Sequence, residues 1–73
     1  MKNWTHDNLT YLRKFYPKGA RVKLNYMNDT QAPPSGTFGT IKFIDDAGTI
    51  HVQWDTGSTL GLIWGEDSFE VVQ

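Results

Sequence analysis

The side chains best suited to chemistry surround one apolar segment, residues 45–57 (DDAGTIHVQWDTG). Asp45 and Asp46 precede this segment, Asp55 follows it, and His51 lies near its centre. Carboxylates and imidazoles bind metal ions and exchange protons with substrates. The alternative is that the aspartates stabilise two tight turns, because a glycine follows each acidic group two residues later.

The spacing favours turns. Ile50, Val52 and Trp54 alternate with polar residues, which is the pattern of a β-strand with one buried face. A strand of this length holds its two ends about 25 Å apart, at roughly 3.3 Å per residue, so its two acidic ends cannot share a metal ion. Aspartate caps turns through its own backbone, and glycine adopts the positive φ that such turns require.

A catalytic site receives little support. His51 falls on the outward face of the strand, where we expect it opposite Lys42 as a solvated pair. His6 lies in the first turn of the expected helix and has no chemical partner nearby in the sequence. No nucleophile elbow, phosphate-binding loop or zinc-binding motif occurs. The sequence therefore predicts no catalytic residue, no metal site and no cofactor.

Five segments alternate apolar with polar residues and are predicted to be strands: 21–27, 40–44, 49–55, 59–64 and 68–72. Several short strands of this kind are typical of a small sandwich or barrel. A hairpin without a bulge places Phe43 opposite Ile50 and Ile41 opposite Val52, with a turn at 45–48. An odd loop at 55–57 then joins the next strand. The alternation of inward and outward positions along each strand assigns Phe43, Trp54 and Phe69 to the core.

One helix is predicted before the strands, over residues 5–16. Its apolar residues fall three and four positions apart, as in Leu9, Leu12 and Tyr16. Pro17 ends it, because proline disfavours helical geometry in the residue before it. So short a helix needs a surface to pack on.

Composition bounds the protein class. A chain of 73 residues forms one domain, 1–73, with a thin core. It has no cysteine and no apolar run long enough to cross a membrane, and we expect a cytoplasmic protein. The net charge is −1, whereas domains that bind nucleic acid through phosphates usually carry a basic excess.

Candidate binding residues lie at the ends of the strands and in one long loop, 27–39, which contains adjacent prolines. Long loops in small domains often bind ligands, although this one also reads as a rigid crossover. Trp4, Tyr11 and Tyr16 are expected to dock the helix. Exposed aromatic residues are common binding anchors, and the predicted partner-binding residues are Tyr26, Met27, Asp29, Phe38 and Trp64.

Residues 16–72 resemble a small family of unknown function found mostly in phages and mobile elements of Firmicutes and related bacteria. The resemblance rests on Y-P-x-G-x-R-V at 16–22, on A-P-P-x-G-T-x-G-T within 27–40, and on D-D-x-G-x-I-x-V-x-W-D-x-G within 44–57. Thr56 and Trp64 depart from the family pattern. The resemblance implies an SH3-like barrel preceded by a helix, and no activity.

Two functions follow as hypotheses. The first is a non-catalytic module, monomeric or homodimeric, that binds and modulates a host protein, such as a defence enzyme. The second is a nucleic-acid module that uses a basic segment with aromatic stacking platforms. Its predicted contacts are Arg13, Lys14, Tyr16, Lys18, Arg21 and Lys23.

Overall fold

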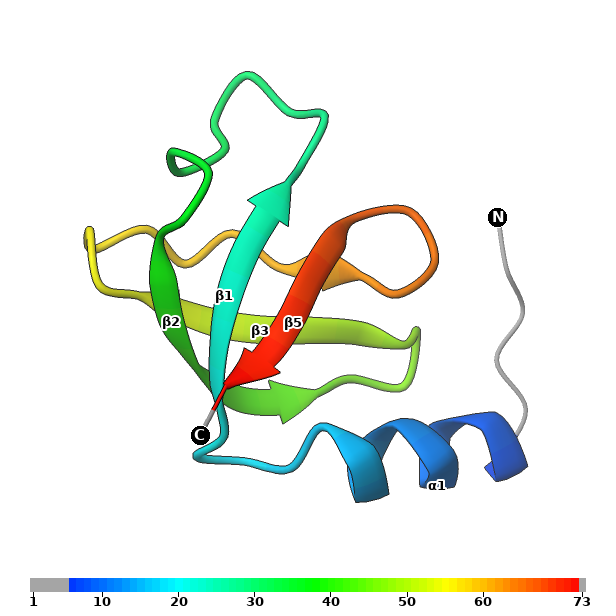
Figure 1. Cartoon of the computed structure of the whole chain (residues 1–73). Helices are drawn as coiled ribbons and strands as arrows, with labels where there is room; N and C mark the ends of the chain where they lie inside the picture. The colour runs from blue at the N-terminus through cyan, green and yellow to red at the C-terminus, as the bar shows by residue number, and fades with distance from the viewer. Residues whose placement is uncertain (1–5, 73) are drawn as a thin grey trace.

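The computed structural model describes residues 6–72, and the side chains of residues 8–72. Helix α1 (His6–Phe15) is followed by strands β1 (Arg21–Tyr26), β2 (Phe38–Ile44), β3 (Thr49–Trp54), β4 (Leu62–Ile63) and β5 (Ser68–Val72). The strands form one antiparallel sheet in the order β4-β3-β2-β1-β5 (Figure 1). The predicted mainly β class, with five strands after one short helix, is confirmed.

The core lies between the sheet and the helix. Leu12 of the helix is fully buried, and the other fully buried side chains come from the predicted inward positions of the strands: Val22, Leu24, Ile41, Ile50, Val52, Trp54 and Leu62. Phe69 packs against this cluster from β5 and is half-buried. No helix within residues 6–72 has both the length and the apolar character needed to cross a bilayer.

Helix α1 packs against the sheet rather than standing apart from it (Figure 1). Leu12 is fully buried, and Leu9 lies at the edge of the same core. The Arg13 guanidinium donates a hydrogen bond to the Ile44 carbonyl oxygen at the end of β2 (3.1 Å). These contacts supply the surface that so short a helix needs. Trp4, which was also predicted to dock the helix, lies outside the described residues.

A β-bulge in β2 decides which side chains reach solvent. The register shifts at Lys42, so that Phe43 lies opposite His51 and Ile44 lies opposite Ile50. An extra residue in one strand turns the following side chains to the other face. Phe43 is therefore 55% exposed and Ile44 is buried. The predicted burial of Phe43, its pairing with Ile50, and the pairing of His51 with Lys42 are all wrong.

The turn after β2 explains the bulge. The Asp45 N–H donates to the Thr49 carbonyl oxygen (3.1 Å), and the Gly48 N–H donates to the Asp45 carbonyl oxygen (3.0 Å). These bonds close a three-residue loop, 46–48, instead of the predicted four-residue turn, 45–48. Gly48 has a φ of 86°, the left-handed conformation that the last position of such a loop requires. An odd loop demands one extra residue in the ladder to keep the core side chains inward.

The loop after β3 has the predicted form. The Trp54 N–H donates to the Ser58 carbonyl oxygen (2.8 Å), which leaves residues 55–57 as the loop. Gly57 has a φ of 97°. The next strand is shorter than predicted, because the Leu60 carbonyl oxygen accepts a bond from the Trp54 indole (2.8 Å) and β4 begins only at Leu62.

Gly39 marks a close approach between β2 and β3. A Cβ at this position would lie 2.6 Å from Val52 Cγ1 and 2.7 Å from Trp54 Cε3. Overpacking of this kind costs about 1–3 kcal/mol. We expect Gly39→Ala to lower the free energy of unfolding by that amount in urea denaturation. The control is Ser35→Ala in the exposed part of the 27–37 loop. Equal stability of both variants would contradict this packing.

Candidate functional site

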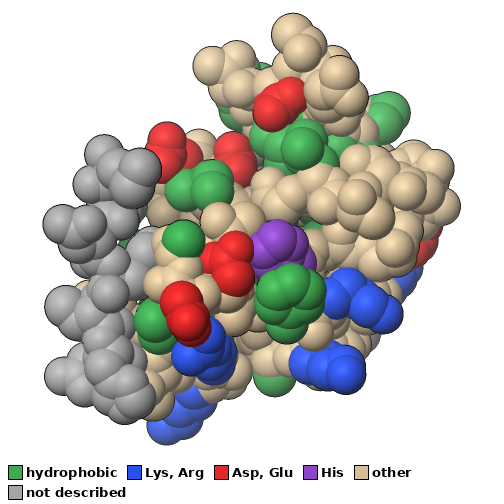
Figure 2. All heavy atoms as spheres, turned by 180° about the vertical axis from the view of Figure 1, so that it is seen from behind, with side chains coloured by type: hydrophobic (Ala, Val, Ile, Leu, Met, Phe, Trp, Pro, Cys, Tyr) green, Lys and Arg blue, Asp and Glu red, His purple; other side chains and the backbone are tan. Residues whose placement is uncertain are grey.

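The bulge builds an exposed cluster on the outer side of β2 and β3. The Phe43 and His51 rings are stacked, with centroids 4.3 Å apart and ring planes 11° apart. Lys42 precedes Phe43 in β2, and Lys18 reaches the same place from the segment between α1 and β1. We call these four residues the Phe43 face. Figure 2 shows the histidine of this face beside a hydrophobic side chain, with basic and acidic side chains around them.

Two shallow hollows flank this face. Lys18, Lys42 and Phe43 line both of them. The first hollow, about 390 Å³, continues along β3 to Gln53 and is also lined by Thr59, which lies between β3 and β4. The second, about 280 Å³, is completed by Arg13, Tyr16 and Pro17 at the end of the helix. A ligand in either hollow would therefore touch Phe43 and the two lysines.

Asp45 orients the histidine of this face. The carboxylate Oδ2 lies 2.7 Å from His51 Nε2, while Oδ1 accepts the N–H groups of Ala47 and Thr49, both at 3.0 Å. An ionised carboxylate only accepts hydrogen bonds, so this contact places a proton on Nε2. The predicted turn role of Asp45 is therefore present, and the same side chain also holds His51 against Phe43.

This arrangement lowers the pKa of Asp45. The hydrogen bond from His51 is the largest cause, followed among the lowering causes by the backbone N–H groups of Thr49 and Ala47, while partial burial acts the other way. A carboxyl with a depressed pKa in the folded state stabilises the fold above its ordinary pKa of 3.8. That stabilisation is lost as the pH falls through the lower, folded value.

We expect Asp45→Asn to keep the turn but to remove this acid-dependent part of stability. An asparagine oxygen still accepts the two backbone N–H groups, whereas the hydrogen bond from His51 loses its charged acceptor. The loss near neutral pH is about 0.2–1 kcal/mol, because the pair is partly solvated. Thermal unfolding of both proteins from pH 7 to pH 3 measures it. A constant difference across that range would contradict the charge-based account.

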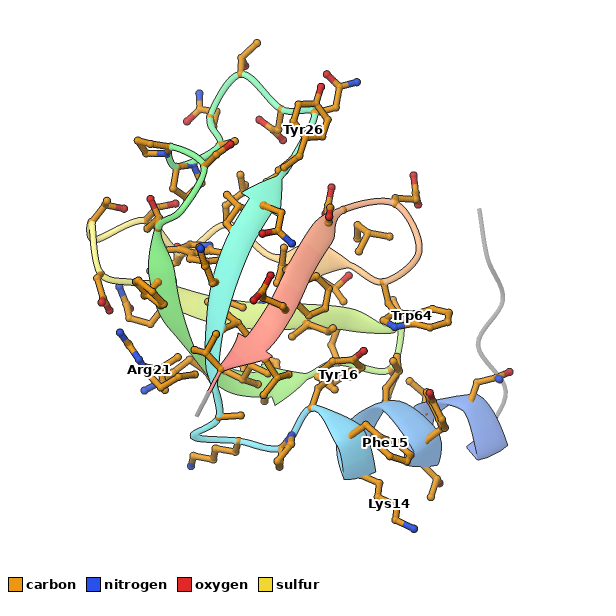
Figure 3. All side chains as sticks on the ribbon, in the orientation of Figure 1. Lys14, Phe15, Tyr16, Arg21, Tyr26 and Trp64 are labelled. Atoms are coloured by element: carbon orange, nitrogen blue, oxygen red, sulfur yellow. The ribbon has the colours of Figure 1, made fainter. Side chains whose placement is uncertain are left out.

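The sequence-predicted partner residues do not form one surface. Tyr26 lies at the end of β1, far along the sheet from Trp64, which lies above the helix (Figure 3). Phe38 is at the start of β2, where the Arg21 guanidinium lies 5.9 Å from its ring centroid. Met27 is buried, at 8% exposure. The five predicted residues are therefore separated. Tyr26 and Asp29 lie at the end of β1 and in the loop after it, Phe38 and Trp64 lie at two other places, and Met27 is in the core.

Two of these residues are also engaged within the chain. Trp64 is half-buried, and its indole donates a hydrogen bond to the Tyr16 hydroxyl (3.1 Å). Asp29 uses its carboxylate to cap the turn in the long loop, where Oδ1 accepts the Gln31 N–H (2.7 Å). The loop itself returns to β1 through the bond from the Gly36 N–H to the Leu24 carbonyl oxygen (2.7 Å).

The basic segment predicted for nucleic acid is also divided. Arg21 forms a bidentate pair with Asp55 (2.9 and 2.7 Å), and Arg13 binds Asp46 (3.1 Å). The first pair raises the pKa of Arg21 and lowers that of Asp55. Tyr16 is half-buried beside another aromatic ring. Within residues 8–72, the lysine ammonium groups have no carboxylate partner: Lys14, Lys18, Lys23 and Lys42.

The acidic residues around β3 serve pairs and turns. Asp45 and Asp46 lie at one end of β3 and Asp55 lies at the other, as their spacing predicts. In the described part of the chain, no group of three or more metal-binding side chains comes together. Within residues 8–72, the His51 ring forms a hydrogen bond only with Asp45.

Phe43 is the candidate residue that sequence reasoning missed. Phe43 and Ile44 are adjacent, and only one of two adjacent strand residues can face the core. The available signal was Gly48, since a glycine three residues after Asp45 suits the same three-residue loop as Gly57 after Trp54. That loop requires Ile44 to point inward.

The comparison with protein families agrees with the resemblance noted in the sequence. The family model described as a domain of unknown function, DUF4314, matches residues 5–72, so the chain belongs to this family. No curated protein and no solved structure matches the chain.

Proposed function

We propose that this DUF4314 domain is a non-catalytic protein-binding module that contacts its partner through the Phe43 face. The proposal rests on one observation: a bulge turns Phe43 out of the core and leaves the residue 55% exposed beside two hollows. Burial of an exposed aromatic ring is a frequent source of binding energy, and such rings anchor many protein interfaces.

The local construction supports this reading. A phenyl ring on an exposed strand position is held in place by a stacked imidazole, which is itself fixed by Asp45. A fixed ring loses less conformational entropy on binding than a freely rotating one. The neighbour of the Phe38 ring is different: it is the Arg21 guanidinium, which is itself paired with Asp55.

The wider setting is part of the same proposal. The sheet order and the preceding helix fit the SH3-like barrel that the family resemblance implies. We propose that the domain comes from a phage or mobile element and acts in the bacterial cytoplasm, by binding and modulating a host protein such as a defence enzyme. Modulation by occupancy requires no catalytic group of its own.

Site-specific crosslinking tests the proposal. The photoreactive residue p-benzoylphenylalanine replaces Phe43, Phe38 or Phe15 one at a time, and the cells are irradiated. We expect a discrete protein adduct at Phe43, and none at Phe15, an equally exposed ring on the helix. An adduct at Phe38 alone would instead favour the surface predicted from the sequence and would refute the Phe43 face.

A further inference from the structure

We infer that the segment which docks on the Phe43 face is acidic and carries a planar side chain, with its carboxylates on Lys18 and Lys42 and its ring on Phe43. This inference rests on the proposed function and names the chemistry of the partner. Three features of the face carry it: its uncompensated charge, the open side of the phenyl ring, and the acidic residues beside it.

The charge available to a ligand comes from lysines. Both described arginines of the basic segment are already in ion pairs, with Asp46 and Asp55. Lys18 and Lys42 have no carboxylate partner within residues 8–72, and both line both hollows. A carboxylate placed in either hollow therefore lies beside two lysines that form no salt bridge with a carboxylate of residues 8–72.

The ring geometry selects a flat neighbour. His51 covers one side of the Phe43 ring in a nearly parallel stack, so the exposed area lies at the ring edge and on the opposite side. Aromatic rings favour offset or edge contacts with other rings, and a tryptophan or tyrosine suits this position. A lone carboxylate without a planar neighbour would leave the phenyl ring exposed to water.

The surrounding acids favour a peptide over nucleic acid. Asp45 and Asp46 lie in the turn next to the face, and the side chain of Asp46 is 97% exposed. A nucleic-acid strand that extends beyond the two lysines toward this turn brings its phosphates close to these carboxylates, which repel them. Nucleic-acid binding normally neutralises several phosphates, whereas one or two carboxylates of a peptide match the two lysines. Tyr16, the aromatic residue among the predicted nucleic-acid contacts, is half-buried against Phe69.

Charge reversal on a defined library tests this inference. A random peptide library displayed on phage is selected on the immobilised protein and on the Lys18→Glu/Lys42→Glu variant. We expect the protein to enrich peptides with aspartate or glutamate beside an aromatic residue. The variant should enrich lysine or arginine beside the same aromatic. The matched control is Lys14→Glu/Lys23→Glu, which changes the net charge equally and should select the same acidic peptides as the unaltered protein.

Binding of one synthetic peptide from that selection gives the numbers. We expect fluorescence anisotropy to show at least about tenfold weaker binding to the Lys18→Glu/Lys42→Glu variant and to Phe43→Ala. Peptides whose binding needs Phe43 but ignores the lysine reversal would overturn the acidic partner and leave the Phe43 face intact. Binding that ignores Phe43→Ala would overturn both. Tighter binding of a short oligodeoxythymidylate than of any selected peptide would assign the face to nucleic acid instead.

Discussion

Trp54→Ala should leave most of the protein unfolded at 25 °C. Trp54 is the largest of the fully buried side chains, at 1% exposure. Removal of a buried tryptophan side chain costs about 3–5 kcal/mol. A single core in a domain this small rarely supplies more than about 3–5 kcal/mol in total. The substitution therefore removes nearly all of the stability, and circular dichroism with urea titration will measure it.

The indole has a second role that a milder variant separates. Its N–H donates to the Leu60 carbonyl oxygen and so holds the segment between β3 and β4. Trp54→Phe keeps most of the ring volume but leaves this carbonyl without its donor, which costs about 1–3 kcal/mol. We expect it to be folded and less stable than Trp64→Phe, whose indole is half-buried. A Trp54→Ala protein with the midpoint of the unaltered chain would refute this core.

Ile44→Ala should mainly lower the stability of the fold, whereas Phe43→Ala should mainly weaken partner binding. Ile44 is buried at 6% exposure, so Ile44→Ala is expected to cost about 2–4 kcal/mol of stability. Phe43→Ala removes an exposed ring and should cost less than about 1 kcal/mol. The same change should weaken partner binding by about 30-fold or more, because anchor residues contribute at least about 2 kcal/mol.

The two substitutions are controls for each other. Both shorten an apolar side chain in the same strand, one residue apart, so a change in strand propensity affects them alike. Urea denaturation gives their stability, and isothermal titration with the crosslinked partner gives their affinity, measured where both variants are folded. A larger stability loss for Phe43→Ala than for Ile44→Ala would mean that the bulge is absent and that the bulge-free register is correct.

Much of the fold follows from local patterns. Val22, Leu24 and Val52 alternate with polar residues, and each is buried as its position in that pattern predicts. The three-residue loop at 55–57 follows from the parity of the flanking strands together with a glycine that can adopt positive φ. Pro17 ends the helix for a reason that the residue type alone supplies.

The missed features depend on interactions between segments. The size of the 46–48 loop decides whether Phe43 or Ile44 faces the core. Because both residues are apolar, residue type alone does not distinguish the two choices. Met27 stands where the predicted strand 21–27 meets the predicted loop 27–39 and was predicted as a partner contact, yet β1 ends at Tyr26 after a register shift and Met27 is buried in the core. Such shifts cost little locally and are selected by packing across the sheet.

The candidate site was hard to predict for the same reason. Sequence reasoning identified exposed aromatic residues at strand ends, but it assigned Phe43 to the interior, so the cluster with Lys18 and Lys42 was not visible. The three aspartates lie at the predicted turns, but only the Asp45 carboxylate accepts backbone N–H groups there. Asp46 and Asp55 pair with arginines instead. The additional contact of Asp45 with His51 arises because the bulge brings that turn and the outward face of β3 together.

A nuclear magnetic resonance titration tests the central claim most directly. The isotope-labelled protein is titrated with the partner identified by crosslinking, and changes in the backbone amide signals are mapped onto the sheet. We predict that the largest changes occur at Lys18, Lys42, Phe43 and His51. Changes concentrated at Tyr26, Asp29 and Phe38, with the amides of the Phe43 face unaffected, would contradict the account.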